Sequence, residues 1–125
     1  MRDEAGDPVV IRNRPVLGDG TPMPTLYWLV GEQARLAVDR LEASGGVRAA
    51  EREVDPQEIE AAHRSYAAER DSYLPDGWTA RRPTGGVGGI RRSVKCLHAY
   101  YAWYLAGGDD PVGRWVARKL EVGAD

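Results

Sequence analysis

The sequence contains a single cysteine, Cys96, so no disulfide bond can form within the chain. It also lacks a long apolar segment, because its longest apolar run, residues 99–106, is far shorter than the roughly 20 residues that a membrane-spanning helix needs. The first residues are charged where a secretory signal peptide would be apolar. These absences favour a protein of the reducing cytoplasm and argue against a membrane partner.

A strong excess of charge of either sign is missing as well, since the formal net charge is -2. Proteins that bind nucleic acid usually carry a clear basic excess, so nucleic acid is not the partner that we expect. One local exception is a basic cluster in residues 81–95, a segment without an acidic residue. The cluster comprises Arg81, Arg82, Arg91, Arg92 and Lys95.

Phenylalanine is absent, whereas the chain has four Trp and six Tyr residues. Indole and phenol groups combine apolar surface with a hydrogen-bonding group, so they suit the walls of a small-molecule pocket, although a core uses them equally well. With 125 residues, of which 42% are hydrophobic, the chain can bury one core. We therefore expect a single domain over residues 1–125, and a homodimer formed through exposed aromatic residues is as consistent with the sequence as a monomer.

The N-terminal third of the chain has the composition of two strands followed by a helix. Residues 9–11 and 25–30 are rich in branched and aromatic side chains, and the connection between them is dense in Gly and Pro. From Glu32 to Ala43 the apolar residues recur at helical spacing, and Gly45-Gly46 is a typical helix stop. We expect a hairpin-like strand pair and a first helix.

Three further helices are expected in the remainder. Asp55-Pro56 is typical of a helix start, and this helix should run to about residue 74. Residues 93–106 form a helix that is apolar on most sides, with Ser93 as its cap, and such a helix is normally buried. Asp110-Pro111 begins a last, shorter helix. The fold class is therefore α+β: a two-stranded β element packed on a bundle of about four helices around a buried central helix, 93–106.

The glycine-rich segment 84–90 is flanked by arginines, and its backbone N–H groups could close around an anion. It matches no known phosphate loop, because Ile90 stands where a Walker loop has Lys and Arg91 where a dinucleotide fingerprint has glycine. A surface loop with solvated arginines is the plainer interpretation.

His63, Tyr66 and Arg70 share one face of the helix that begins at Asp55. His63 could carry a proton near neutral pH, Tyr66 could donate a hydrogen bond, and Arg70 could bind a carboxylate or phosphate. The alternative is structural, with His63 and Tyr66 as buried packing residues and Arg70 paired to an acid.

Cys96 and His98 lie two residues apart, so on a regular helix they point in directions about 200° apart and cannot act on each other. A catalytic Cys96 would need the imidazole of His63, or a thiol activated by Lys95 and the helix N-terminus. Core packing is the alternative, since free cysteines are among the most buried residues.

Several motifs together resemble one bacterial family, the domain of unknown function 501, over nearly the whole chain. They are DGTPMPTLYWL at residues 19–29, His63 with Tyr66 and Arg70, VKCLHA at residues 94–99, and PVG at residues 111–113. The resemblance implies a cytoplasmic bacterial protein without an agreed activity.

This sequence departs from the family pattern at two cysteines that typical members carry, one near the N-terminus and one after the second strand. Here Asp3-Glu4 and Gly31-Glu32 occupy these places. In the family such cysteines could join Cys96 and His98 as ligands of zinc or an iron–sulfur centre. With two thiolates missing, the resemblance implies a degenerate metal site, so we expect no metal and no cofactor.

Two functions are consistent with these patterns. The first is a small-molecule-binding protein, or a cofactor-independent acid–base enzyme, that takes an anionic or polar organic molecule in a pocket between helix 55–74 and segment 81–105. Its catalytic candidates are His63, Cys96 and His98. Its substrate-binding candidates are Tyr66, Arg70, Arg91, Arg92, Lys95 and Trp28. The second is a non-catalytic adaptor or regulatory protein with a degenerate Cys/His metal site.

Overall fold

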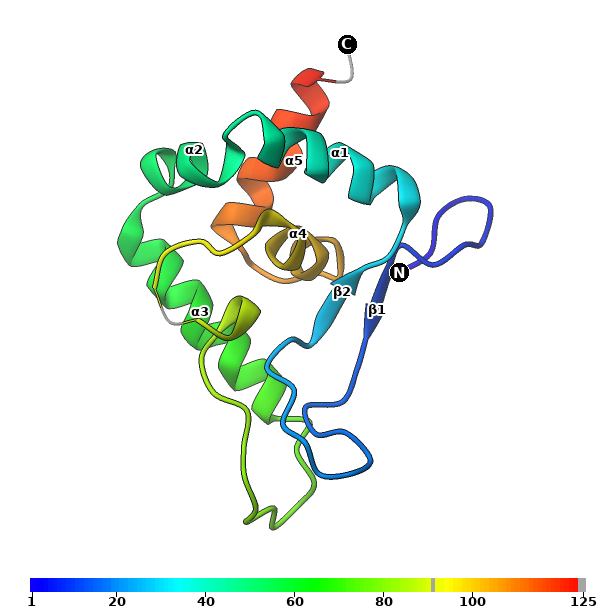
Figure 1. Cartoon of the computed structure of the whole chain (residues 1–125), viewed down its shortest axis with the longest axis vertical. Helices are drawn as coiled ribbons and strands as arrows, with labels where there is room; N and C mark the ends of the chain where they lie inside the picture. Colours follow the sequence, from blue (N-terminus) through cyan, green and yellow to red (C-terminus); the bar gives the residue numbers. More distant parts are fainter. Residues whose placement is uncertain (91, 124–125) are drawn as a thin grey trace.

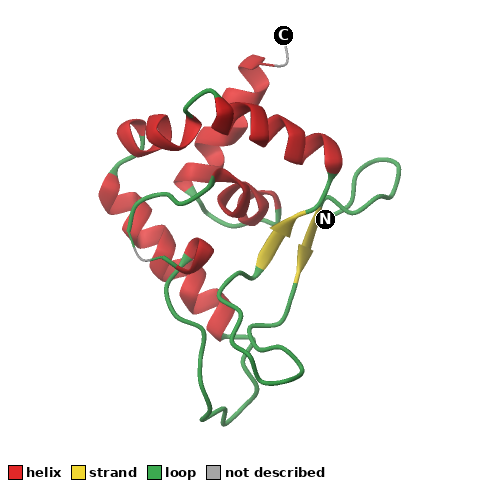
Figure 2. Cartoon of the chain, in the orientation of Figure 1, coloured by secondary structure: helices red, strands yellow, loops and turns green. Residues whose placement is uncertain are grey.

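The computed structural model of the chain describes residues 1–90 and 92–123. Two short strands, β1 (Val10–Arg12) and β2 (Tyr27–Leu29), pair antiparallel with Ile11 opposite Trp28. Figure 2 shows this hairpin on one side of a set of helices. The α+β prediction is therefore confirmed, with five α-helices among the described residues instead of about four. In the described part of the chain, no helix has the length and apolarity needed to cross a membrane.

Helix α4 (Leu97–Leu105) lies in the middle of the molecule (Figure 1). It contacts β2, helix α1 (Glu32–Ala43) and helix α5 (Pro111–Gly123). Side chains on several of its faces are buried, which is why its sequence is apolar almost all round. The buried residues are Leu97, Ala99, Tyr100, Ala102 and Trp103. The predicted buried central helix is confirmed.

The start of α4 differs from the prediction, because Ser93 does not cap it. Ser93 has a positive φ of 58°, and Cys96, at the N-cap position, is extended. No side chain of the segment itself caps the helix; instead Glu42 of α1 accepts a hydrogen bond from the Leu97 N–H (2.7 Å). The helix therefore begins at Leu97, four residues later than expected, because its cap comes from another element.

A helix that the sequence did not predict, α2 (Gly46–Glu53), follows α1. Gly45 adopts the left-handed conformation (φ 91°) that ends α1, as expected, but Gly46 begins the next helix. A Cβ at Gly46 would lie 2.6 Å from the Leu41 carbonyl oxygen, so the turn between the helices requires glycine there. The Gly45-Gly46 pair indicated a helix stop, so the helix that begins at this pair was missed.

The two remaining predicted caps are present. Asp55 accepts a hydrogen bond from Gln57 N–H (2.8 Å) at the start of α3 (Pro56–Asp71), which ends three residues before Leu74. Asp110 accepts from Val112 N–H (3.1 Å) and from the next amide of α5 (2.9 Å), and its side chain is fully buried. Burial raises the pKa of Asp110 to about 7, although these two hydrogen bonds act in the opposite direction.

Replacing Asp110 by Asn keeps an acceptor at the start of α5 but removes the titrating carboxyl group. Because the pKa of Asp110 is raised from 3.8 to about 7 on folding, its stabilising contribution is complete below pH 3.8 and is lost as the pH rises through 7. The free energy of unfolding of the wild type, minus that of Asp110→Asn, should therefore decrease from about pH 4 to pH 7 and then level off. Urea unfolding at several pH values measures this difference.

The exposed Asp76 offers a matched control, and Asp76→Asn should show no such trend. Asp110→Ala, which removes the cap altogether, should lower the free energy of unfolding by about 1 kcal/mol or more. A pH-independent difference between the wild type and Asp110→Asn would show that burial does not control this carboxyl group.

Candidate functional site

A pocket of about 520 Å³ lies between α3 and a later segment, residues 83–90 with Arg92. The 3₁₀ turn η1 (Val87–Gly89) holds part of this segment against α3 (Figure 1). Charged and polar side chains from both sides form the wall. The charged or titratable residues of the wall are Glu60, His63, Arg64, Arg70, Asp71 and Arg92.

Arg70 is part of the pocket wall, although its side chain is only 1% exposed. Its Nε donates to Asp71 Oδ1 (3.1 Å), and its Nη1 donates to the carbonyl oxygens of Gly85 (2.8 Å) and Pro24 (3.2 Å). These bonds tie α3 to the pocket segment and to the chain that enters β2. Nη2 makes no hydrogen bond to the described residues, so a donor remains at the pocket wall.

His63 is 2% exposed, and both of its ring nitrogens have partners within the protein. Nδ1 accepts a hydrogen bond from Val87 N–H (3.0 Å), so the proton of the neutral ring is on Nε2. Nε2 lies 2.9 Å from the Ser93 carbonyl oxygen and 3.0 Å from the Tyr100 hydroxyl. Burial lowers the pKa of His63, in agreement with a neutral imidazole. His63 thus connects α3 to the segment that leads into α4.

Tyr66 shares one face of α3 with His63 and Arg70, but its side chain is directed towards β2. Its hydroxyl accepts hydrogen bonds from Leu26 N–H (2.6 Å) and Tyr27 N–H (3.2 Å), and the side chain is fully buried. Its ring packs edge-on against Trp103 of α4. Tyr66 does not line the pocket, because its hydroxyl is used by the backbone that begins β2.

The other predicted substrate-binding residues are dispersed. Trp28 is 43% exposed on β2 and donates to Asn13 Oδ1, away from the pocket. Lys95 is exposed and does not line the pocket, whereas Arg92 does, with its Nε 3.8 Å from Glu60 Oε1. Arg91 lies outside the described residues. The pocket therefore unites His63, Arg70 and Arg92 from the predicted set.

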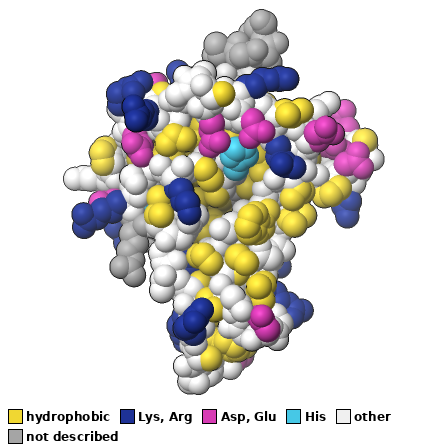
Figure 3. Space-filling model, viewed as in Figure 1, with side chains coloured by type: hydrophobic (Ala, Val, Ile, Leu, Met, Phe, Trp, Pro, Cys, Tyr) yellow, Lys and Arg dark blue, Asp and Glu magenta, His cyan; other side chains and the backbone are white. Residues whose placement is uncertain are grey.

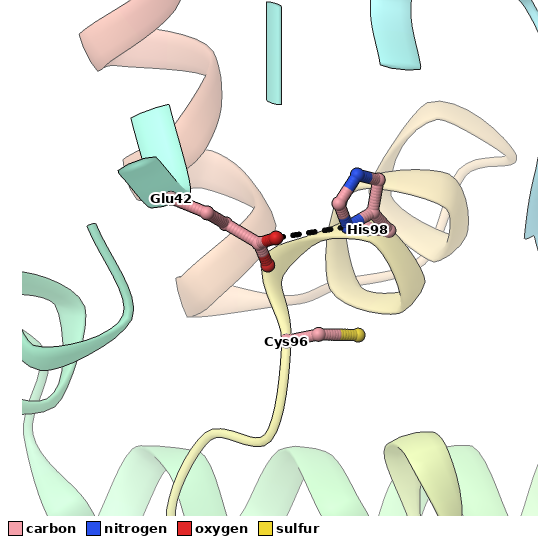
Figure 4. Close-up of side chains that lie close together, drawn as sticks. All are labelled: Glu42, Cys96 and His98. Carbon is pink, nitrogen blue, oxygen red and sulfur yellow. Dashed lines mark ion pairs between the residues drawn. The ribbon is translucent and has the colours of Figure 1, made fainter. Parts of the chain in front are cut away.

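Cys96 and His98 belong to a second cluster, where α1 meets the start of α4 (Figure 4). His98 Nδ1 lies 3.4 Å from Glu42 Oε1, and its Nε2 lies 2.7 Å from Asp39 Oδ1. Neither Cys96 with His98 nor Cys96 with His63 forms a hydrogen bond in the described structure. Sequence reasoning missed both acids, because two carboxylates at i and i+3 on α1 resemble an ordinary solvated helix face.

A family model described as a protein of unknown function, DUF501, matches residues 1–118. Comparison with curated proteins gives no match. Comparison with solved structures gives none either. The similarity therefore identifies a family but supplies neither an activity nor a ligand.

The contacts of His63 predict that this residue stabilises the fold. His63→Ala leaves the buried Val87 N–H without an acceptor and opens a cavity, which should lower the free energy of unfolding by on the order of 3 kcal/mol. Since burial lowers the pKa of His63 below 6.5, its contribution is complete above pH 6.5 and is lost as the pH falls below that value. Urea unfolding and hydrogen exchange at Val87 measure both effects.

Arg64, the next residue on α3, is exposed, so Arg64→Ala is a suitable control that should change stability by less than about 0.5 kcal/mol. Unchanged exchange protection of the Val87 amide in His63→Ala would refute the anchoring role.

Proposed function

The chain belongs to the DUF501 family, whose function is unknown, and we propose that its pocket between α3 and residues 83–90 with Arg92 binds a small anionic or polar organic molecule. One observation carries this proposal: the guanidinium group of Arg70 is buried in the pocket wall, and its Nη2 has no hydrogen-bond partner among the residues that the structure describes. A carboxylate or phosphate group is the natural acceptor for such a donor.

The charges around the pocket support the same ligand class. Three arginines, Arg64, Arg70 and Arg92, contribute to the wall, against two acids. One of these, Asp71, already accepts from Arg70 Nε, and the other, Glu60, lies opposite Arg92. The positive charge therefore exceeds the negative charge by one, and the arginines supply directional donors.

The backbone of the glycine-rich segment contributes less than its sequence indicated. Gly86 N–H donates to the Ile90 carbonyl oxygen (2.6 Å), Val87 N–H donates to His63, and Gly89 N–H donates to the Gly86 carbonyl oxygen (2.9 Å). These amides are occupied and cannot also close around an anion. Affinity for a negative ligand is therefore assigned to the guanidinium groups rather than to these three amides.

The size of the pocket is consistent with a small organic ligand. A volume of about 520 Å³ falls within the roughly 300–1,000 Å³ that is usual for small-molecule sites. Inorganic phosphate would leave much of this volume empty, whereas a di- or tricarboxylate or a phosphorylated sugar would fill more of it.

We propose binding as the activity of this pocket, because His63 would have to leave one of its hydrogen bonds before it could exchange a proton with a ligand. The acid–base role of His63 stays a prediction. It is tested by His63→Ala once a substrate is found, and an unchanged rate constant in this variant would eliminate the role.

Titration of ¹⁵N-labelled protein with citrate, a tricarboxylate probe, tests the binding proposal. Amide shifts should concentrate in residues 60–71, in residues 83–90 and at Arg92, and glycerol, a neutral polyol, should cause none there. Arg64→Ala and Arg92→Ala each remove a cationic group from the pocket wall, and because both side chains are exposed, each should weaken citrate binding by about two- to fivefold.

Arg35→Ala is the matched control, because Arg35 is exposed on α1 and does not line the pocket. Its affinity for citrate should equal that of the wild type. Citrate shifts that lie elsewhere, or that respond equally to Arg35→Ala and Arg64→Ala, would refute an anion site in this pocket.

A further inference from the structure

The second cluster brings together three different donor groups from distant parts of the sequence. Glu42 lies near the end of α1, Cys96 directly precedes α4, and His98 is in the first turn of α4. One ligand atom of each side chain lies within 4.8 Å of the other two. Figure 4 shows the Glu42 carboxylate directed at the His98 ring, with the Cys96 side chain extending from the chain just before the helix.

We propose that Glu42, Cys96 and His98 form a binding site for a zinc ion. Carboxylate oxygen, thiolate sulfur and imidazole nitrogen are the three donor types that Zn²⁺ takes in proteins, whereas Mg²⁺ and Ca²⁺ prefer oxygen alone. Zinc–ligand bonds of about 2.0–2.3 Å place the donors of a tetrahedral site roughly 3.3–3.8 Å apart. The cluster therefore needs to contract by only about 1 Å to hold the ion.

The orientation of His98 supports this assignment. Its Nε2 lies 2.7 Å from Asp39 Oδ1 and can donate to that carboxylate, so Nδ1, which lies 3.4 Å from Glu42 Oε1, is the nitrogen that would bind the metal. A carboxylate on the far nitrogen of a ligating imidazole is the usual outer support of a zinc-bound histidine. Asp39 is therefore a positioning residue for His98.

Glu42 is held in place in a similar way. Its Oε2 accepts the Leu97 N–H (2.7 Å), whereas Oε1 faces His98 Nδ1 at 3.4 Å. One oxygen thus orients the carboxylate and the other remains for a metal. Two of the three donors are fixed by partners outside the cluster, which distinguishes it from a chance grouping of surface side chains.

The site is open to solvent on one side. The side chains of Glu42 and His98 are 25% and 28% exposed, and Cys96 is half-buried. Figure 3 shows a histidine on this face of the molecule with acidic side chains beside it. Three protein ligands leave a fourth position for water or for a donor atom of another molecule, which is the arrangement of catalytic rather than structural zinc sites.

The proposed zinc site shares no side chain with the anion pocket. It therefore does not depend on the proposed function, and each proposal can fail without the other. The competing explanation is that the imidazole of His98, held between two carboxylates, only ties α1 to α4. Metal titration distinguishes the two, because a purely structural contact binds no zinc.

Calorimetric titration of metal-free, reduced protein with zinc chloride should give one ion per chain. Substitution with Co²⁺ should give a thiolate-to-cobalt charge-transfer band. Cys96→Ser should abolish this band and weaken zinc binding at least tenfold. Asp39→Asn should keep the band but weaken binding about 10- to 100-fold, as expected for the loss of an outer support. Binding should also weaken at lower pH, because protons compete for all three donors.

Glu58→Gln removes an exposed carboxylate of α3 and should leave zinc affinity unchanged. Circular dichroism identifies any variant that fails to fold, and the measurement on the wild type needs no variant. Absence of zinc binding to the folded wild type would overturn the proposal, as would a cobalt spectrum that is the same in Cys96→Ser.

Discussion

The buried polar row of α3 is the constraint on which the arrangement of this molecule depends. The chain runs from residue 72 to residue 96 with a single 3₁₀ turn among its described residues, and such irregular backbone has polar groups that need partners when it is packed against a core. His63 and Arg70 supply partners to this segment, and Tyr66 does the same for the backbone that begins β2. Each connects α3 to backbone far away in the sequence, so the three side chains replace the hydrogen bonds that a larger sheet would provide.

Those parts of the fold that depend on local chemistry could be predicted from the sequence. Asp55 and Asp110 cap the helices that follow them, and the strand pair and the buried central helix occur where their composition indicated. Elements that depend on long-range contacts could not be predicted. Helix α4 takes its cap from Glu42, 55 residues earlier. Helix α2 was missed for a different reason, because its start depends on the local backbone geometry that brings Gly46 close to Leu41, and composition does not indicate this geometry.

The same distinction applies to the candidate site. Helical periodicity correctly placed His63, Tyr66 and Arg70 on one face, but it does not indicate what that face contacts. In the structure the row divides: Tyr66 faces β2, whereas His63 and Arg70 reach the pocket segment. Glu42 and Asp39 were missed because their importance arises only from the position of His98, which the packing of α1 on α4 determines.

The cap of α4 and the proposed metal ligation both use Glu42, yet they do not compete. The Leu97 N–H is bound to Oε2, and the oxygen that faces His98 is Oε1. A zinc ion on Oε1 would keep the cap bond, and it would replace the contact between Glu42 and His98 with a shared metal. Because the ion would bind α1 and α4 together only in the folded chain, its binding energy would add to the free energy of folding. The Glu42 carboxylate would therefore cap α4 with one oxygen and hold the metal with the other.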